Sequence, residues 1–165
     1  MNLIPKITVK IKVLPGGRMP EKKTAGAAAW DCYARIDMPE APKDMPEAPK
    51  DEMWIPKRHR GAKVPLGFAM EIPEGYHAEI LPRSSTGAKT PFRVSNSAGI
   101  IDSDYRGEVC ALIDNINWCM PEVVRDGDRI VQMLIVKDPD VELVEADELS
   151  KTDRGASSFG STGKR

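Results

Sequence analysis

The sequence predicts an all-β domain, a sandwich or barrel with at most one short helix. Ile7, Val9, Ile11 and Val13 alternate with polar residues, which is the period of a half-buried strand. Glycines, prolines and turn clusters recur at short intervals, as they do between short strands. No stretch before Pro139 repeats apolar residues with the 3.6-residue period of a long helix.

The composition fits one domain and argues against several classes of protein. A chain of 165 residues can bury a real core, and its net charge of -1 does not suggest a nucleic-acid partner or a membrane surface. No apolar run could cross a bilayer, and the N-terminus lacks the apolar segment of a signal peptide, so we expect a cytoplasmic protein. Three cysteines without CxxC spacing indicate reduced thiols, and two histidines in no ligand pattern argue against zinc.

The strands follow the first one at short spacing. The turn Pro15-Gly16-Gly17 ends the first strand, and further strands are predicted over 65–73 and 77–82, joined by a turn at 73–75. Between them, residues 37–43 and 44–50 repeat the same seven residues, Asp-Met-Pro-Glu-Ala-Pro-Lys. Two copies are too few for a solenoid, and the prolines cannot donate sheet hydrogen bonds. We predict a Pro-rich loop insertion over 37–52, with a protein partner at the 37–50 loop as the alternative.

Arg83, Ser84 and Ser85 form a candidate anion site. The serines suit the N-cap of one short helical turn, which Gly87 and Pro91 keep short. A guanidinium, two hydroxyls and free backbone N–H groups suit phosphate. A surface arginine beside a serine cap is the alternative.

The segment 102–107 is polar and lies between the apolar runs 99–101 and 109–113. Apolar runs around a short Asp/Ser/Gly segment predict a β-hairpin. Asp102 and Asp104 are two residues apart, so both point to one side if the strand period continues. An ordinary turn is the alternative for this segment alone.

Gln132 is the only polar residue within the run 130–136, which is apolar on both faces and therefore predicts an inner strand. A buried glutamine needs hydrogen-bond partners. A neighbouring backbone group and a ligand are equally good candidates.

The tail, 151–165, is rich in Gly, Ser and Thr and cannot build a core. It does not match the P-loop pattern, because Ser161 stands where the lysine belongs and no helix can follow. A mobile tail that orders over a bound phosphate is the prediction, and a mobile terminus without a ligand is the alternative.

Together, five segments resemble the signature motifs of the trimeric dUTP pyrophosphatases (dUTPases), in family order: 25–31, 82–85, 96–109, 127–132 and 154–163. The resemblance implies a jelly-roll-like β domain over 1–150 and a mobile phosphate-binding tail over 151–165. It also implies a homotrimer in which one subunit supplies the first, second and fourth motifs, a second the segment 96–109, and a third the tail.

The resemblance further implies that dUTP is hydrolysed with Mg²⁺ to dUMP and pyrophosphate, which keeps uracil out of DNA and supplies dUMP for dTTP synthesis. Asp102 matches the residue that orients and deprotonates the water attacking the α-phosphorus, a role that an ionised carboxylate can fill. Asp31 matches the aspartate that helps to hold the metal through its water shell. An aspartate at a strand end is the alternative for Asp31.

The remaining site residues are also implied by the resemblance. Asn96 and the backbone of Gly99, Ile100 and Ile101 would read the uracil edge. Tyr105 would lie under the deoxyribose and leave no room for a 2′-hydroxyl. Phe159 would stack over the uracil. The residues matched to phosphate binding are Arg83, Ser84, Ser85, Gln132, Arg154, Gly160, Ser161 and Thr162.

Two alternatives and one departure accompany this interpretation. A dCTP deaminase of the same fold also carries a Pro-Arg-Ser-like segment, although the 102–105 segment and the tail argue against it. A dUTP-gated regulator that binds a protein partner is the second alternative. Ser157 and Ser158 stand where the family commonly has two glycines, which would weaken tail closure if positive φ is needed there.

Overall fold

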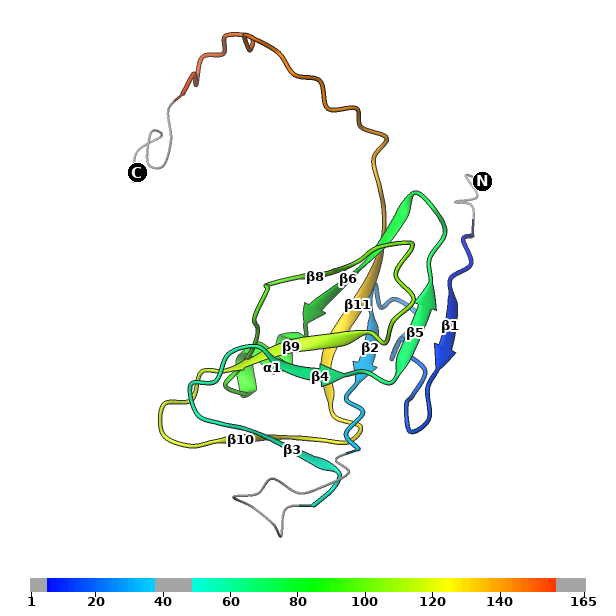
Figure 1. Ribbon diagram of the computed structural model, residues 1–165, viewed down its shortest axis with the longest axis vertical. Coiled ribbons are helices and arrows are strands. Elements are labelled where there is room, and N and C mark those ends of the chain that lie inside the picture. The colour runs from blue at the N-terminus through cyan, green and yellow to red at the C-terminus, as the bar shows by residue number, and fades with distance from the viewer. Residues whose placement is uncertain (1–5, 38–48, 157–165) are drawn as a thin grey trace.

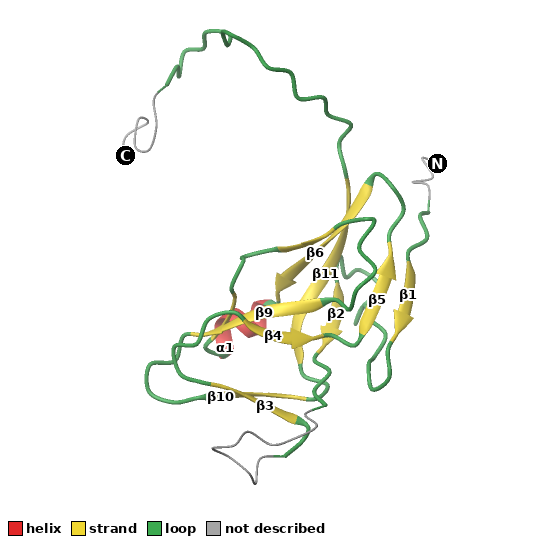
Figure 2. Cartoon of the chain, in the orientation of Figure 1, coloured by secondary structure: helices red, strands yellow, loops and turns green. Residues whose placement is uncertain are grey.

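The computed structural model describes residues 6–37 and 49–156. The described part is all-β with one short helix, as predicted (Figure 2). In chain order its elements are β1 (Lys10–Val13), β2 (Trp30–Tyr33), β3 (Glu52–Ile55), β4 (Ala62–Pro65), β5 (Phe68–Glu71), β6 (Tyr76–Pro82), α1 (Ser84–Lys89), β7 (Phe92–Val94), β8 (Gly99–Ile101), β9 (Cys110–Asn115), β10 (Glu122–Arg125) and β11 (Arg129–Lys137).

The strands form a jelly-roll-like sandwich around one core. The larger sheets have the orders β2-β11-β6-β8 and β4-β9-β7, and the pairs β1-β5 and β10-β3 complete the structure (Figure 1). Val64 and Ile113 from one large sheet and Ile80 and Val131 from the other are fully buried in the same cluster. These apolar faces belong to different sheets, so their contact holds the two layers together.

Strand β11 occupies an inner position, between β2 and β6, which confirms the prediction from its apolar run. It pairs with β6 over seven consecutive positions, from Val131↔Pro82 to Lys137↔Tyr76. Its register with β2 shifts between Arg129 and Val131, as it does at a β-bulge. The shift leaves Ile130 without a partner on β2.

The first strand is shorter than the alternating pattern. Residues 6–11 alternate between exposed and half-buried, as predicted, but only Lys10–Val13 pairs with β5 and Val13 is exposed. The predicted strand 65–73 contains the last residue of β4 and all of β5, with a turn between them. The backbones of Gly17 and Gly67 approach closely at this turn: a Cβ added to Gly17 would lie only 1.9 Å from the carbonyl oxygen of Gly67.

The predicted hairpin around 102–107 is wrong. Strand β8 pairs with β6 in one large sheet, whereas β9 pairs with β4 and β7 in the other. The segment therefore connects the two layers of the sandwich. Local pattern identifies both strands but not their partners, because long-range packing of the apolar faces decides which strands pair.

Helix α1 begins at Ser84, but its N-cap is Arg83 and the cap makes no side-chain hydrogen bond. The prediction that Ser84 and Ser85 cap the helix is therefore wrong, because both serines lie within its first turn. The helix is held instead by Thr86, whose buried hydroxyl donates to the carbonyl oxygen of Ile130 at 2.8 Å. This contact uses the carbonyl of the residue that the register shift leaves without a partner on β2.

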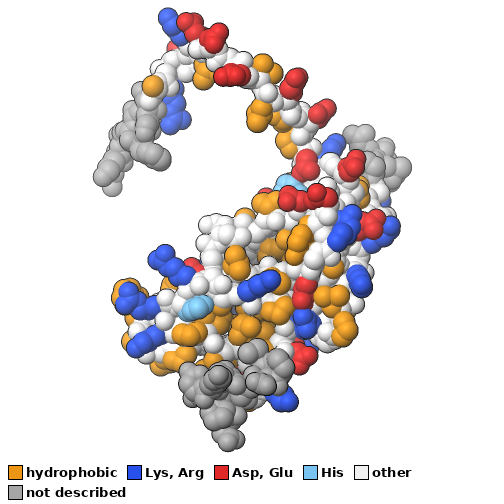
Figure 3. Space-filling view, viewed as in Figure 1, with side chains coloured by type: hydrophobic (Ala, Val, Ile, Leu, Met, Phe, Trp, Pro, Cys, Tyr) orange, Lys and Arg blue, Asp and Glu red, His pale blue; other side chains and the backbone are white. Residues whose placement is uncertain are grey.

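After β11 the chain leaves the sandwich as an arm of residues 138–156 (Figure 1). Acidic and hydrophobic side chains are interspersed along it, and Val141, Leu143, Val144 and Leu149 are exposed (Figure 3). The exposed arm begins before the predicted boundary at 150, which stays a prediction. In the described ranges no helix is long and apolar enough to cross a membrane.

Thr86→Val keeps the shape of this side chain but leaves the Ile130 carbonyl without its hydroxyl donor. We expect the free energy of unfolding to fall by about 1–2 kcal/mol, the usual cost of losing a buried hydrogen bond. Urea denaturation measures the change, with Thr86→Ser as the control that keeps the hydroxyl. A loss in Thr86→Ser but none in Thr86→Val would show that the methyl group, not the bond, holds the helix.

The root of the arm contains an ion pair that depends on pH. His77 Nδ1 lies 2.5 Å from Asp138 Oδ1, and this hydrogen bond, supported by Glu79, raises the pKa of His77 above its ordinary value of 6.5. The stabilisation is therefore complete below pH 6.5 and is lost as the pH rises through the raised value. We expect an NMR titration to show the raised pKa and Asp138→Asn to lower it. An unchanged value in that variant would contradict the assignment.

Candidate active site

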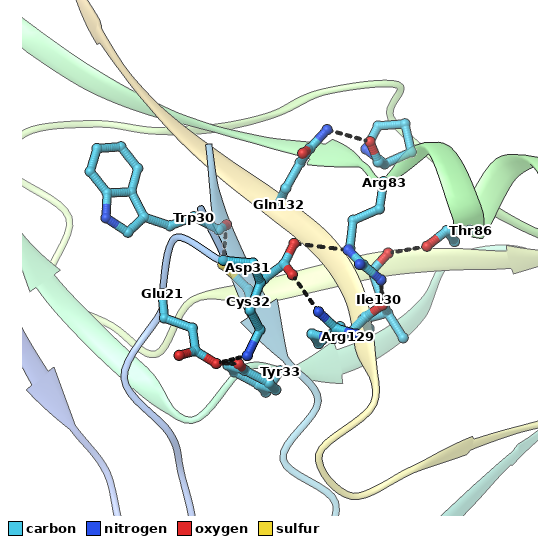
Figure 4. A network of polar contacts seen from close by, with 12 residues as sticks. Glu21, Trp30, Asp31, Cys32, Tyr33, Arg83, Thr86, Arg129, Ile130 and Gln132 are labelled. Carbon is cyan, nitrogen blue, oxygen red and sulfur yellow. Dashed lines mark hydrogen bonds and ion pairs between the residues drawn. The ribbon is translucent and has the colours of Figure 1, made fainter. Parts of the chain in front are cut away.

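Asp31 on β2 forms ion pairs with Arg83, the N-cap of α1, and with Arg129 on β11 (Figure 4). Arg83 Nε donates to Asp31 Oδ1 at 2.8 Å, and Arg129 Nη1 donates to Oδ2 at 3.0 Å. The Asp31 side chain is only 14% exposed, so both ion pairs lie partly out of water. Arg83 Nη1 also donates to the backbone oxygen of Arg129 at 2.8 Å. These contacting groups form one polar cluster at the ends of β2, β6 and β11.

The sheet register brings these residues together. Gln132 on β11 lies opposite Asp31 on β2 and opposite Leu81 on β6. Its side-chain amide donates to the carbonyl oxygen of Pro82 at 3.0 Å. The backbone partner that the sequence allows for Gln132 is therefore present, directly beside Arg83. Its role as a phosphate contact stays a prediction.

Two hollows lie beside the cluster. The larger, about 640 Å³, is lined by Ser85 and Thr86 and by four cationic side chains, those of Arg83, Lys89, Arg125 and Arg129, against the acids Glu122 and Asp128. The smaller, about 360 Å³, is lined by Lys23, Asp31 and Gln132 among alanines. An excess of cations beside a helix start suits an anion with several charges.

The donor atoms fit a magnesium ion that arrives with a phosphate ligand. Within residues 6–37 and 49–156, no three His, Cys, Asp or Glu side chains cluster to hold a metal. Asp31 already forms ion pairs with two guanidinium groups, so its carboxylate is partly engaged. Mg²⁺ commonly keeps several waters and relies on substrate phosphates, so a protein cage is not required.

The segment 102–107 presents exposed polar groups on a fixed backbone. Asp102 and Asp104 are both exposed, with half-buried Ser103 between them, as the two-residue spacing suggests. The Tyr105 N–H donates to the carbonyl oxygen of Asp102 at 3.2 Å, which closes the turn. Tyr105 is 44% exposed, so part of its surface is accessible to a ligand.

Asn96 lies on a tight turn that precedes β8. Ser97 has φ of 61°, and the N–H of Ala98 donates to the carbonyl oxygen of Asn96 at 2.6 Å. The Asn96 amide nitrogen would lie 3.5 Å from a Cβ on Gly99, so its side chain is next to the start of β8. Gly99 and Ile101 are half-buried, and Ile100 is exposed. The structure therefore brings Asn96 next to Gly99 at the start of β8, and their role in binding uracil stays a prediction.

The structure keeps Asp102 apart from Arg83 within one chain. Ile101 lies opposite Ala78 on β6, whereas Arg83 follows the other end of β6. At about 3.3 Å per residue, the five steps from Ala78 to Arg83 separate these ends by about 16 Å. Asp102 lies on the side of Ile101 that is farther from Arg83. Asp102 and Arg83 are therefore well separated within one chain, whereas Gly99, opposite Ile80, lies closer to Arg83.

The tail contributes little to the described site. Arg154 lies in an exposed turn near the end of the arm, where the N–H of Gly155 donates to Thr152. The remaining predicted tail residues, Phe159, Gly160, Ser161 and Thr162, lie outside the described residues, as do Ser157 and Ser158. Most of the repeat, 38–48, is also outside them.

Sequence reasoning misses two members of the cluster. Arg129 lies in the motif 127–132 but is not identified by it, because an arginine at a strand start is usually a solvated charge. Thr86 directly follows the two serines and is not identified either. The signal that could find Arg129 is its place directly before a buried run, on the same strand as Gln132.

Asp31→Asn keeps the size of the side chain but removes the anion between two guanidinium groups. We expect the free energy of unfolding to fall by about 2–4 kcal/mol, because both charges then lack a counter-charge. Urea denaturation measures the change. Glu71→Gln is the control, since it breaks an exposed ion pair with Lys10 and should have no resolvable effect. Indistinguishable results for the two variants would contradict a structural role for the Asp31 pairs.

Comparisons with known proteins identify the family of this chain. A family model described as dUTPase matches residues 47–163. The deoxyuridine 5'-triphosphate nucleotidohydrolase of Caulobacter vibrioides is 38% identical over 145 residues, covering 88% of this chain and 85% of the relative. The enzyme of the same name from Beijerinckia indica is 38% identical over 160 residues, covering 96% and 92%.

Solved structures show the same fold. A point mutant of the Staphylococcus bacteriophage 80alpha dUTPase with dUpNHpp has a TM-score of 0.78 and 24% identity, covering 96% of this chain and 99% of that one. A mutant dUTPase from phage phi11 of S. aureus, described with a structural Mg(II) ion, has a TM-score of 0.71 and 20% identity, covering 88% and 100%. The family match and the two relatives at 38% identity show that this chain belongs to the dUTPase family.

Proposed function

We propose that this protein hydrolyses dUTP to dUMP and pyrophosphate, and so keeps uracil out of DNA and supplies dUMP for dTTP synthesis. The observation that carries the proposal is the cationic groove beside Arg83 and Arg129, in a chain of the dUTPase family. A triphosphate is the part of dUTP that needs such a groove. The same chain presents Asp102 and Tyr105 on an ordered loop, which suits them to the reacting water and the sugar.

The phosphates would bind between α1 and the start of β11. Arg83 and Arg129 share one carboxylate, so the two guanidinium groups and Asp31 together carry a net positive charge. Arg83 can donate to a phosphate oxygen through the part of its guanidinium that faces the groove, which Ser85 also lines. Ser84 and Gln132, which lines the smaller hollow, are the other proposed polar contacts. Arg154, Gly160, Ser161 and Thr162 of the tail would close over the phosphates.

Asp102 would act as the general base. Its carboxylate accepts a proton from a water molecule as the water oxygen bonds to the α-phosphorus. The bond between the α-phosphorus and the bridging oxygen to the β-phosphate breaks, and pyrophosphate leaves with the electron pair. Mg²⁺, when bound, supplies positive charge along the triphosphate. Asp31 is the residue proposed to hold its water shell, a role that competes with the two ion pairs that this carboxylate already makes.

Substrate selection would lie in the segment 96–105. Asn96 and the backbone of Gly99, Ile100 and Ile101 would pair with the uracil edge. The exposed face of Tyr105 would lie under the deoxyribose, where a 2′-hydroxyl would clash with the ring. Phe159 would stack over the base from the opposite side.

A homotrimer would bring these groups together. Within one chain Asp102 lies beyond Ile101, on the side of β8 that is farther from Arg83, so we propose that a second copy supplies the segment 96–109. The exposed arm can carry the tail away from its own sandwich toward another subunit (Figure 1). A closed ring of three copies satisfies such repeated contacts. The unpaired thiols Cys32, Cys110 and Cys119 agree with the reducing cytoplasm proposed as the location.

Pyrophosphate release from dUTP, UTP, dTTP and dCTP tests the proposal. We expect release from dUTP to be far faster than from the other three nucleotides, abolished by a magnesium chelator and lowered at least about 100-fold by Asp102→Asn, because an amide cannot accept the proton. Asp104→Asn is the matched control on the same loop and should keep most of the activity. Dynamic light scattering on the same samples should give the size of a trimer.

Three outcomes would contradict the proposal. Ammonia release from dCTP would identify a deaminase, which the family match disfavours. Binding of dUTP without pyrophosphate release would favour the dUTP-gated regulator. Full activity of Asp102→Asn would remove Asp102 from its role as the base.

Deletion of residues 37–50 tests whether this loop takes part in catalysis or only in partner binding. We expect the shortened protein to retain turnover.

A further inference from the structure

The carboxylate of Glu108 is held by three donors at the end of the segment 102–107. Arg35 Nε donates to Oε1 at 2.9 Å and Arg35 Nη2 to Oε2 at 2.8 Å, so the pair is bidentate. The N–H of Gly67 also donates to Oε1, at 3.0 Å. Both charged side chains are only 23% exposed. A bidentate, partly buried pair fixes direction as well as distance, unlike a typical surface ion pair.

Arg35 is itself fixed. Its N–H donates to the carbonyl oxygen of Pro65 at 2.9 Å, and its side-chain carbons lie against Gly67, where an added Cβ would be 3.1 Å from Arg35 Cδ. The backbone of Val109 is bonded on both sides, to Leu66 at 3.0 Å and to Phe68 at 2.8 Å. Glu108 is therefore attached to the core of the sandwich through its side chain and through its neighbour.

Glu108 in turn holds Tyr105. The Tyr105 hydroxyl donates to the backbone oxygen of Glu108 at 3.1 Å. The ring passes over Gly107, where an added Cβ would lie 2.4 Å from the hydroxyl oxygen and 2.6 Å from Cζ. Only glycine leaves room for the ring in this position. The Tyr105 N–H then reaches back to the carbonyl oxygen of Asp102 at 3.2 Å.

We propose that Arg35 and Glu108 are positioning residues that fix the plane of the Tyr105 ring and thereby set discrimination against nucleotides with a 2′-hydroxyl. The inference rests on the proposed function, in which Tyr105 lies under the sugar. A contact of 3.1 Å to a backbone oxygen orients the ring only if that oxygen is itself immobile. The bidentate pair with Arg35 provides that immobility, because it prevents the backbone at Glu108 from moving.

Electrostatics agree with a fixed, ionised Glu108. Burial opposes ionisation of this carboxylate, but the hydrogen bonds from Arg35 and Gly67 and the charges of Arg35 and Lys63 outweigh it and lower its pKa below the ordinary value. The carboxylate therefore stays charged at neutral pH and accepts all three hydrogen bonds. Glutamine at this position accepts fewer, because its amide nitrogen would face a guanidinium donor.

A positioning role and a purely structural role make different predictions. General loss of stability would lower turnover of every substrate by the same factor. A ring that can move would admit a 2′-hydroxyl, so it would change the ratio between dUTP and UTP. The informative quantity is therefore the kcat/KM for dUTP divided by that for UTP.

The experiment compares Glu108→Gln, Arg35→Lys and Gly107→Ala with the native protein. We expect Glu108→Gln to lower the dUTP/UTP ratio about tenfold, which corresponds to about 1.4 kcal/mol of lost discrimination. Arg35→Lys keeps the charge but not the bidentate geometry and should give an intermediate ratio. Gly107→Ala should lower the ratio with the ion pair intact, because the added methyl group displaces the ring.

Asp126→Asn is the matched control. Asp126 also accepts from an arginine, Arg18 at 3.1 Å, and from a backbone N–H, that of Ile36 at 3.0 Å, and its side chain is 28% exposed. Neither of these contacts involves the segment 102–107. Any effect of this variant on the phosphates would change dUTP and UTP turnover together, so the ratio should stay at the native value.

Hydrogen exchange of the amides of 102–109 is a second readout that needs no catalysis. Faster exchange at Tyr105 in Glu108→Gln, but not in Asp126→Asn, supports the anchoring even if the native protein fails to hydrolyse dUTP, which would overturn the proposed function alone. A native ratio and native exchange in a folded, active Glu108→Gln protein would overturn the positioning role and leave the proposed function standing. Melting temperatures confirm that each variant is folded.

Discussion

The carboxylate of Asp31 offsets the repulsion between the guanidinium groups of Arg83 and Arg129, on which the cationic groove depends. Without Asp31, the guanidinium groups of Arg83 and Arg129 would repel each other in a partly buried place. With it, the three groups keep a net positive charge and remain ordered before any ligand arrives. The folded protein therefore holds in place the cations that we propose bind phosphate, and less ordering would remain to be done on binding.

The segment 102–109 divides exposure and rigidity between different residues. Asp102 and Tyr105, which are proposed to contact the ligand, are exposed; Tyr105 contacts the backbone of Glu108, and Asp102 is held through Tyr105. Charged groups that supply the rigidity, such as Arg35 and Glu108, are largely shielded from solvent and pair with each other. Exposure and rigidity are thus assigned to different residues, so an open surface need not be a flexible one.

Local pattern predicts much of this structure. The apolar run around Gln132 correctly predicts an inner strand, because burial on both faces leaves a mark in the sequence itself. Strand pairing leaves no such mark, and the hairpin predicted from β8 and β9 is wrong. Ion pairs are equally hidden, since Asp31 and Arg129 are 98 residues apart and Arg35 and Glu108 are 73 apart. Composition and spacing do not encode contacts over such distances. Asp31, Glu108 and Arg129 lie within the family motifs, but the motifs do not say which residues they contact.

The register shift in β11 limits how this gene can change in length. One residue more or fewer at Ile130 would move every side chain of β11 to the opposite face of the sheet. Gln132 would then move away from Asp31, and Val131 would leave the core. The duplicated heptapeptide at 37–50 shows that length has been added elsewhere in the same chain. Insertions and deletions should therefore accumulate in the loop between β2 and β3 and be purged at the start of β11.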